Sequence, residues 1–312
     1  DIRGNAIVGE RIRILRRLME GEPITVVATI DGGMDKVLPL DYLKENCIQI
    51  RSTDTVNISE LEAKLVQMGY ERQIQVEAAG EFAVRGGIID IFPLTEEAPV
   101  RVELWGDEVD SIRSFDSASQ RSIENLEEIR IYPASEFVLE QAVKEKGLAA
   151  LEAELKEFAA KLRAERKNEE AARIGKAVAE FKENLEYCQG SVGLDSYVNY
   201  FFTKTVSFFD YFCDGESAIF LDEPARIMEK GQTVMTEFSE SMTGRIEKGY
   251  ILPGQMDVIF DYRALLAGIM GANAILLSML ETKFEKLPVL ARYSLTVKSV
   301  NPYNNNFELL IR

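Results

Sequence analysis

An Asp and a Glu directly follow an apolar stretch in the segment SAIFLDEP. Such a stretch is typical of a buried strand, which would place Asp222 and Glu223 at its carboxyl end. In nucleotide-hydrolysing folds, an Asp at this position holds Mg²⁺ and the next Glu orients the attacking water. The same chemistry needs a glycine-rich loop for the phosphates, and the 312-residue sequence contains neither GxxxxGKS nor GxxxxGKT. Nucleotide hydrolysis by this chain is therefore not predicted.

Arginines that alternate with apolar residues form a second candidate site. Arg85 ends the stretch EFAVR, while Arg101 and Glu103 alternate with apolar residues in VRVELW. Alternate residues of a strand point to the same side, so Arg101 and Glu103 are expected on one face. The arginines are either members of cross-strand salt bridges on an open face or a docking patch for a partner's carboxylates. The residues alone favour neither interpretation.

Composition removes several classes of chemistry. The sequence contains no histidine, which excludes Ser-His-Asp and Cys-His nucleophilic sites and the HExxH zinc helix. Its 36 Lys and Arg residues and 52 Asp and Glu residues give a formal charge of −16, so the chain alone is not expected to bind nucleic acid. Cys47, Cys188 and Cys213 form no CxxC pair, which is typical of reduced thiols. No metal and no cofactor are expected.

The N-terminal segment and the longest apolar run indicate whether the chain is exported or inserted into a membrane. The opening segment, DIRGNAIVGERIRILRRL, is charged throughout and is neither a signal peptide nor an anchor. The uncharged run Ala264 to Leu280 is interrupted by Gly and Asn, which favours a short helix and a buried strand over a bilayer span. We expect a cytoplasmic chain without membrane contact. Its start at Asp1 indicates that it was cut from something longer.

Asp222 and Glu223, the strand-end acids, lie among predicted elements that resemble an α/β core. Residues 9–20 and 38–45 are predicted helices, and ITVVATI at 24–30 is a predicted buried strand. Later segments contain the predicted buried strands SAIFLDEP and NAILLSMLET, with the helix DYRALLAGIMG between them. These strands are expected to complete the sheet that begins near Ile24.

Arg85 and Arg101 lie in a region where the sequence predicts mainly strands. ISELEAKLVQMGY predicts a helix with Ser59 as its N-cap and Gly69 as its end. The segments GEFAVRGGIIDIFP, PVRVELWGDEVDSIRSFD and ENLEEIRIYPA then predict an antiparallel meander. Residues 53–137 contain 7 Lys and Arg and 18 Asp and Glu, a net charge of 7 − 18 = −11. This region should avoid DNA and prefer a basic partner surface.

A helical segment and a tail complete the division. Residues 139–187 carry apolar side chains at spacings of three and four, which predicts two antiparallel helices that pack within the chain around Lys167 and Asn168. We therefore expect an incomplete helicase-like α/β core with a parallel sheet, an inserted small antiparallel α+β domain and a helical subdomain. The predicted parts are 1–52 and 196–285 for the core, 53–137 for the inserted docking domain, 138–195 for the helical subdomain, and 286–312 for a linker into a following domain.

These motifs follow the order of a known family. GYER, GEFAVRGGIIDIFP, VRVELWGDEVDSIRSFD, SQRS and YPASEF succeed one another at the family spacing. On these residues the whole chain resembles the N-terminal part of the bacterial transcription-repair coupling factors (Mfd), whose opening domains are similar to the excinuclease B subunit (UvrB). That subunit shows FRVRG, VDESH and SATPG where this chain has FAVRG, LDEPA and SMLET. These departures favour the coupling factors over the excinuclease subunit.

The resemblance implies a function and a partner. It implies a non-hydrolytic UvrB-like module that recruits the excinuclease A subunit (UvrA) to RNA polymerase stalled at DNA damage, in transcription-coupled nucleotide excision repair. The full-length parent would be an ATP-dependent DNA translocase, with ATP and Mg²⁺ bound in motor domains absent from this chain. RNA polymerase and DNA would be contacted only through absent domains. The parent's C-terminal domains would cover the docking face, which makes the module autoinhibitory.

The resemblance also implies site residues. The partner-binding set is Arg72, Phe82, Arg85, Arg101 and Glu103, and Ala83 replaces the first arginine of FRVRG. Asp222 and Glu223 become vestigial acids of a nucleotide site. The alternative hypothesis is a nucleotide-dependent DNA repair enzyme of the excinuclease B type, which would require a phosphate loop upstream of Asp1.

Overall fold

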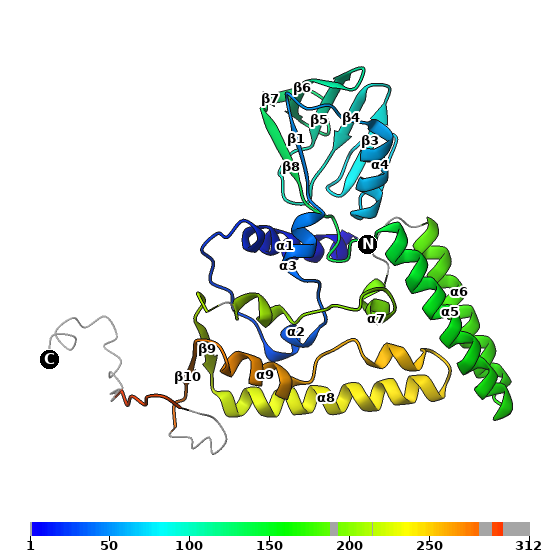
Figure 1. Ribbon diagram of the computed structural model, residues 1–312, viewed down its shortest axis with the longest axis vertical. Helices are drawn as coiled ribbons and strands as arrows, with labels where there is room; N and C mark the ends of the chain where they lie inside the picture. Colours follow the sequence, from blue (N-terminus) through cyan, green and yellow to red (C-terminus); the bar gives the residue numbers. More distant parts are fainter. Residues whose placement is uncertain (1, 188–192, 214, 281–288, 296–312) are drawn as a thin grey trace, which may run out of the picture. The chain divides into compact units, whose positions relative to one another are not determined.

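The computed structural model describes residues 2–187, 193–213, 215–280 and 289–295 (Figure 1). Two units separate by their internal contacts, residues 1–279 and 280–312. All helices and strands of the described residues lie in the first unit, and the described residues of the second form none. The fold is mixed α/β. Among the described helices, none has both the length and the apolar character needed to cross a bilayer.

A six-stranded sheet dominates the region of the arginines. The strand order is β2-β3-β4-β5-β6-β7, and every neighbouring pair is antiparallel except β2 and β3, which are parallel. The predicted meander is therefore confirmed for β3 to β7, whereas the strand in ENLEEIRIYPA does not belong to this sheet. The strands are β2 (Glu71–Arg72), β3 (Glu81–Arg85), β4 (Ile88–Ile91), β5 (Val100–Trp105), β6 (Glu108–Phe115) and β7 (Ser122–Asn125).

Helix α4 (Ile58–Gln67) precedes the sheet and buries Leu61 and Leu65. Asn57 is its N-cap, because the Asn57 side chain accepts a hydrogen bond from the Glu60 N–H at 3.1 Å, so the prediction of Ser59 was wrong by two residues. Gly69 stops the helix as expected: it follows the C-cap residue Met68 and has a positive φ of 89°. A Cβ at Gly69 would also lie 2.8 Å from the Cβ of Ser135, so only glycine fits this turn.

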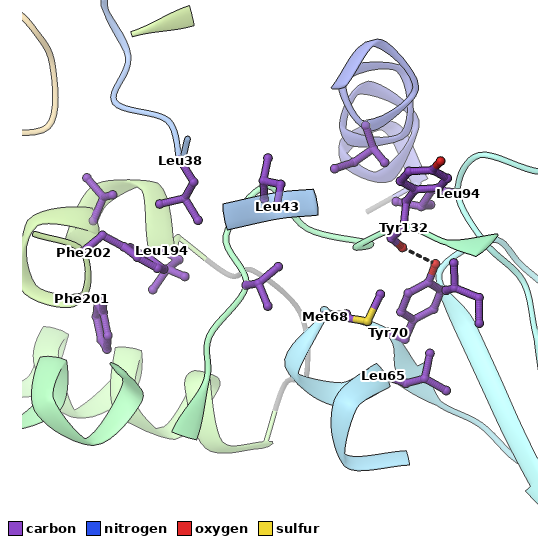
Figure 2. Packing of buried hydrophobic residues seen from close by; sticks show 14 of the residues in the cluster. Leu38, Leu43, Leu65, Met68, Tyr70, Leu94, Tyr132, Leu194, Phe201 and Phe202 are labelled. Carbon is purple, nitrogen blue, oxygen red and sulfur yellow. Dashed lines mark hydrogen bonds between the residues drawn. The ribbon is translucent and has the colours of Figure 1, made fainter. Parts of the chain in front are cut away.

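A second, two-stranded antiparallel sheet joins β1 (Ile48–Arg51) to β8 (Glu128–Ile131). We call residues 48–137, with β1 to β8 and α4, the β-rich lobe; Figure 1 shows these elements gathered together. Its core includes Tyr70, whose hydroxyl donates to the Tyr132 carbonyl oxygen at 2.7 Å (Figure 2). One hydrophobic core connects this lobe to the helical segments, because Leu38 and Phe202 belong to the same cluster as Leu65 and Tyr70 (Figure 2).

The helical hairpin has the predicted form. Helices α5 (Gln141–Ala164) and α6 (Asn168–Tyr187) lie side by side (Figure 1), and buried side chains of both belong to the core. The turn between them contains Arg166 with a positive φ of 64°. The short helix α7 (Val198–Phe201) packs against α5, where Gly147 leaves room for the ring of Phe201. The element η1 (Leu194–Tyr197) directly precedes α7.

The predicted parallel sheet is reduced to two strands. β9 (Ile219–Asp222) and β10 (Ala274–Leu277) pair in parallel and confirm two predicted strands. One side of this pair, with Phe220, Ile275 and Leu277, is exposed and not buried as expected. The predicted strand 24–30 was wrong: residues 22–29 form no regular structure, and Val27 is 95% exposed. The helicase-like sheet is therefore not confirmed in the described residues.

The remaining elements are helical. α8 is a 24-residue helix that sequence patterns did not predict, whereas α1, α3 and α9 confirm predicted helices. Proline occupies the first turn of α8, where its missing N–H costs no hydrogen bond. The bounds are α1 (Ile2–Met19), α2 (Ile30–Met34), α3 (Leu40–Glu45), η2 (Phe208–Phe212), α8 (Pro224–Glu247), η3 (Pro253–Met256) and α9 (Tyr262–Met270).

Candidate docking surface

The register of the six-stranded sheet separates its two faces. Opposed residues lie on the same face, so the pairs between β3 and β6 define one polar row and one mixed row. The polar row is Ala83, Asp90, Arg101 and Arg113, and the mixed row is Arg85, Ile88, Glu103 and Ser111. The opposite face is apolar and buried, with Phe82, Ile89, Val102 and Ile112. We call the first side the polar face of the β-rich lobe.

Asp90 lies at the centre of the polar face, and its side chain is only 1% exposed. Its Oδ1 accepts from Arg101 Nε at 2.6 Å, and its Oδ2 accepts from Arg101 Nη2 at 2.8 Å. Oδ2 also accepts from Arg85 Nη2 at 2.6 Å. A buried carboxylate without partners would be costly, so the two guanidinium groups compensate its charge.

Arg101 is fixed on every side. Its side chain is 14% exposed, and its Nη2 also donates to Gln120 Oε1 at 2.9 Å. The guanidinium carbon lies 4.5 Å from the ring centroid of Phe115, a cation–π contact. Hydrogen bonding to Asp90 raises the pKa of the Arg101 guanidinium further above its ordinary value. Arg101 is therefore mainly a structural partner of Asp90.

Arg85 is the more accessible arginine, with a side chain that is 44% exposed. Beyond it, Gly86 takes a positive φ of 62° in the turn between β3 and β4. Glu103, on the neighbouring strand, forms an ion pair with Arg113 and accepts from Ser111 Oγ at 3.1 Å. The polar face thus combines internal salt bridges with one arginine that reaches solvent, so both interpretations of the arginines describe part of it.

Two predicted residues do not join this face. The register pairs Arg72 with Phe82, whose side chain is fully buried on the apolar side. Arg72 Nη2 forms an ion pair with Glu62 Oε1 of α4 at 3.0 Å, which holds Arg72 away from the polar face. Of the five predicted partner-binding residues, Arg85, Arg101 and Glu103 lie on the polar face. Phe82 belongs to the core and is not accessible to a partner in this structure.

Trp105 is a candidate that sequence reasoning missed. It is the single tryptophan of the chain and is 82% exposed. In β5 it continues the alternation of Arg101 and Glu103, so it lies on the polar face. Tryptophan and arginine are the residues most enriched among binding hot spots. The signal was present in VRVELW, where the three outward positions are Arg, Glu and Trp.

The strand-end acids have a different environment. Asp222 is exposed at the end of β9, in register with Leu277 of β10. Glu223 has a positive φ of 53°, and its Oε1 accepts from the Met279 N–H at 2.8 Å. In the described part of the chain, no group of three acidic or cysteine side chains converges to hold a metal ion. That these acids are remnants of a nucleotide site stays a prediction.

Comparison with known proteins identifies the β-rich lobe. The sequence model of the UvrB interaction domain family matches residues 48–137. The transcription-repair-coupling factor of Bacillus subtilis is 37% identical over 258 residues, which are 83% of this chain and 22% of that protein. The factor of Staphylococcus epidermidis is 29% identical over 97% of this chain and 25% of its own length, and that of Staphylococcus haemolyticus is 33% identical over 82% and 21%.

These matches define the class first: residues 48–137 form a UvrB interaction domain, and the sheet that carries the polar face lies inside it. Over most of its length the chain is homologous to the bacterial transcription-repair-coupling factors. It spans between about a fifth and a quarter of the length of these relatives.

Proposed function

We propose that this chain is a non-catalytic docking module that recruits UvrA to RNA polymerase stalled at DNA damage. The observation that carries the proposal is the polar face inside the UvrB interaction domain, where Arg85, which binds the buried Asp90, and Trp105 are both exposed. An exposed tryptophan and an exposed arginine on one face are residue types typical of a binding hot spot. The name of the relatives, transcription-repair-coupling factor, supports the repair context.

The charges of the lobe indicate what the partner should present. The two rows of the polar face between β3 and β6 contain three arginines and two acids, a local charge of 3 − 2 = +1, within a predicted domain whose net charge is −11. A complementary partner would place carboxylates opposite Arg85 and basic residues around them. Such complementarity acts on the association rate and on specificity.

Further partners belong to the same proposal. The C-terminal domains of the full-length parent would cover the polar face and keep it autoinhibited until the parent engages RNA polymerase. RNA polymerase and DNA would bind to parts outside this chain, as would the ATP and Mg²⁺ of the motor. The exposed state of Arg85 and Trp105 in this chain is compatible with a cover that is supplied from elsewhere.

Titration of purified UvrA against the chain tests the docking proposal. Arg85→Ala should lower the affinity at least about 30-fold, because a hot-spot arginine contributes roughly 2 kcal/mol or more. Arg51→Ala is the matched control, since Arg51 pairs with Glu128 on the two-stranded sheet, and it should bind like the wild type. Equal affinities of the wild type and Arg85→Ala would place the docking site elsewhere.

A further inference from the structure

A continuous series of contacts leads from the interior of the β-rich lobe to Arg85. The ring of Phe115 supports the Arg101 guanidinium, Arg101 binds Asp90 through two hydrogen bonds, and Asp90 binds Arg85. Exposure rises along the last part of this series, from 1% at Asp90 to 44% at Arg85. The most accessible guanidinium group of the series is thus anchored to its most buried charge.

Gln120 holds the other end of the series. Its side-chain oxygen accepts from Arg101 Nη2, and its Nε2 donates to the Ser117 carbonyl oxygen at 2.8 Å. Its backbone takes a positive φ of 60°, which is unfavourable for a residue with a side chain. The turn keeps this conformation through a hydrogen bond from the Gln120 N–H to the Asp116 carbonyl oxygen at 2.8 Å.

We propose that Asp90 and Gln120 are positioning residues that hold the Arg85 guanidinium ready for the carboxylate of a partner. The proposal rests on the proposed docking function. Only Nη2 of Arg85 donates to Asp90, and within the described residues Nε and Nη1 have no hydrogen-bond partner. These two nitrogens can therefore donate to a carboxylate while the third stays on Asp90. An arginine already held in place loses less side-chain entropy on binding.

A double-mutant cycle with the full chain and purified UvrA tests this arrangement. Asp90→Asn keeps the shape of the side chain but removes the charge that holds Arg85, and we expect a loss of affinity of roughly 3- to 10-fold. The same change in an Arg85→Ala background should alter the affinity less than about twofold, because no guanidinium remains to be positioned. Glu128→Gln is the matched acid-to-amide control, since it breaks an ion pair with Arg51 on the other sheet.

The outcomes separate positioning from docking and from stability. Equal losses from Asp90→Asn in both backgrounds would overturn the proposal, because a general effect on the fold would not depend on Arg85. Unchanged or tighter binding of Asp90→Asn, together with weak binding of Arg85→Ala, would overturn positioning but leave the docking surface intact. Normal binding of Arg85→Ala would overturn the docking surface itself.

A second variant keeps the test decisive if Asp90→Asn melts below the assay temperature. Gln120→Met has a side chain of similar length and is equally disfavoured at a positive φ, and it removes the acceptor for Arg101 together with the donor to the Ser117 carbonyl oxygen. It should weaken UvrA binding about 2- to 5-fold with Arg85 present and leave it unchanged with Arg85→Ala. If Gln120→Met changes the affinity neither in the wild-type chain nor in the Arg85→Ala chain, Gln120 is not a positioning residue.

Discussion

Arg85 and Arg101 bind the same carboxylate but differ in what else they can do. Arg101 uses Nε and Nη2 on Asp90 and Gln120 and is stacked on Phe115, so few of its donors remain for a partner. Arg85 uses one nitrogen and keeps the rest toward solvent. Substitution of Arg101 should therefore lower stability, whereas substitution of Arg85 should lower the affinity for the partner.

Arg101→Ala should lower the free energy of unfolding by about 3 kcal/mol, because the buried Asp90 then keeps only the partly exposed Arg85 as a counter-charge. Arg113→Ala is the matched comparison, since Arg113 pairs with Glu103 nearer to the surface and should cost about 1 kcal/mol or less. Urea unfolding of both variants measures the difference. Equal stabilities would show that Asp90 does not depend on Arg101.

Trp105→Ala should lower the affinity for UvrA about tenfold or more without lowering stability, because the ring buries little surface in the free chain. Trp105→Phe keeps an aromatic ring and should lose less. Val27→Ala removes another exposed apolar side chain outside the β-rich lobe and serves as the control. Titration with thermal melts measures both properties, and a Trp105→Ala variant that binds normally would exclude the ring as an anchor.

At the scale of elements, local patterns predicted local structure. The alternation in the meander and the spacing in α4, α5 and α6 each specify one buried side, and the structure confirms these elements. The 24–30 prediction failed because an apolar run becomes a strand only when another strand pairs with it, and the described residues provide none there. The separation of Arg72 from Arg85 and Arg101 could not be predicted, because its side depends on the parallel register of β2 with β3, which no local pattern encodes.

Two glycines within helix α8 explain why this helix was not predicted from the sequence. Glycine weakens a helix by about 1 kcal/mol relative to alanine, so Gly231 and Gly244 lower the helical signal of this segment. In the structure Gly231 faces the ring of Tyr262, and a Cβ there would lie 2.6 Å from Tyr262 Cγ. A Cβ at Gly244 would have no heavy atom within 4 Å. One glycine thus has a packing role that only the tertiary structure reveals.

Gly231→Ala and Gly244→Ala should therefore change stability in opposite directions. Gly244→Ala should raise the free energy of unfolding by roughly 0.5–1 kcal/mol through helix propensity. Gly231→Ala gains the same propensity but forces the buried Tyr262 ring to move, with a net loss of roughly 1–2 kcal/mol. Chemical unfolding of the pair measures both. A stabilised Gly231→Ala variant would mean that α8 and α9 separate easily at this contact.

For the whole molecule, the candidate chemistry and the candidate docking surface lie in different parts of one unit. Asp222 and Glu223 follow β9, whereas Arg85, Asp90 and Trp105 belong to the six-stranded sheet. The Glu223 carboxylate accepts the Met279 N–H, which ties the end of β10 to the start of α8. This contact gives Glu223 a structural role that needs no nucleotide.

We predict that the chain hydrolyses no ATP above background, because the sequence has no phosphate loop to accompany these acids. Asp222→Ala should leave both turnover and stability unchanged, whereas Glu223→Ala should lower stability by about 1 kcal/mol through the lost hydrogen bond. A coupled phosphate-release assay and thermal melts test the two variants together. ATP turnover that Asp222→Ala abolishes would restore the enzyme hypothesis.

The charge of the whole chain leads to the last prediction. At −16 the chain should repel a phosphate backbone. The local charge of +1 in the two rows between β3 and β6 is too small to reverse this at physiological salt, where fields decay over about 8 Å. Fluorescence anisotropy with a labelled duplex should therefore show no binding at roughly 0.15 M salt. Arg85→Ala should not change that result, although it weakens UvrA binding, so the pair of assays separates protein docking from non-specific attraction to anions. Duplex binding that strengthens steeply at low salt and is lost in Arg85→Ala would instead make the polar face a nucleic-acid site.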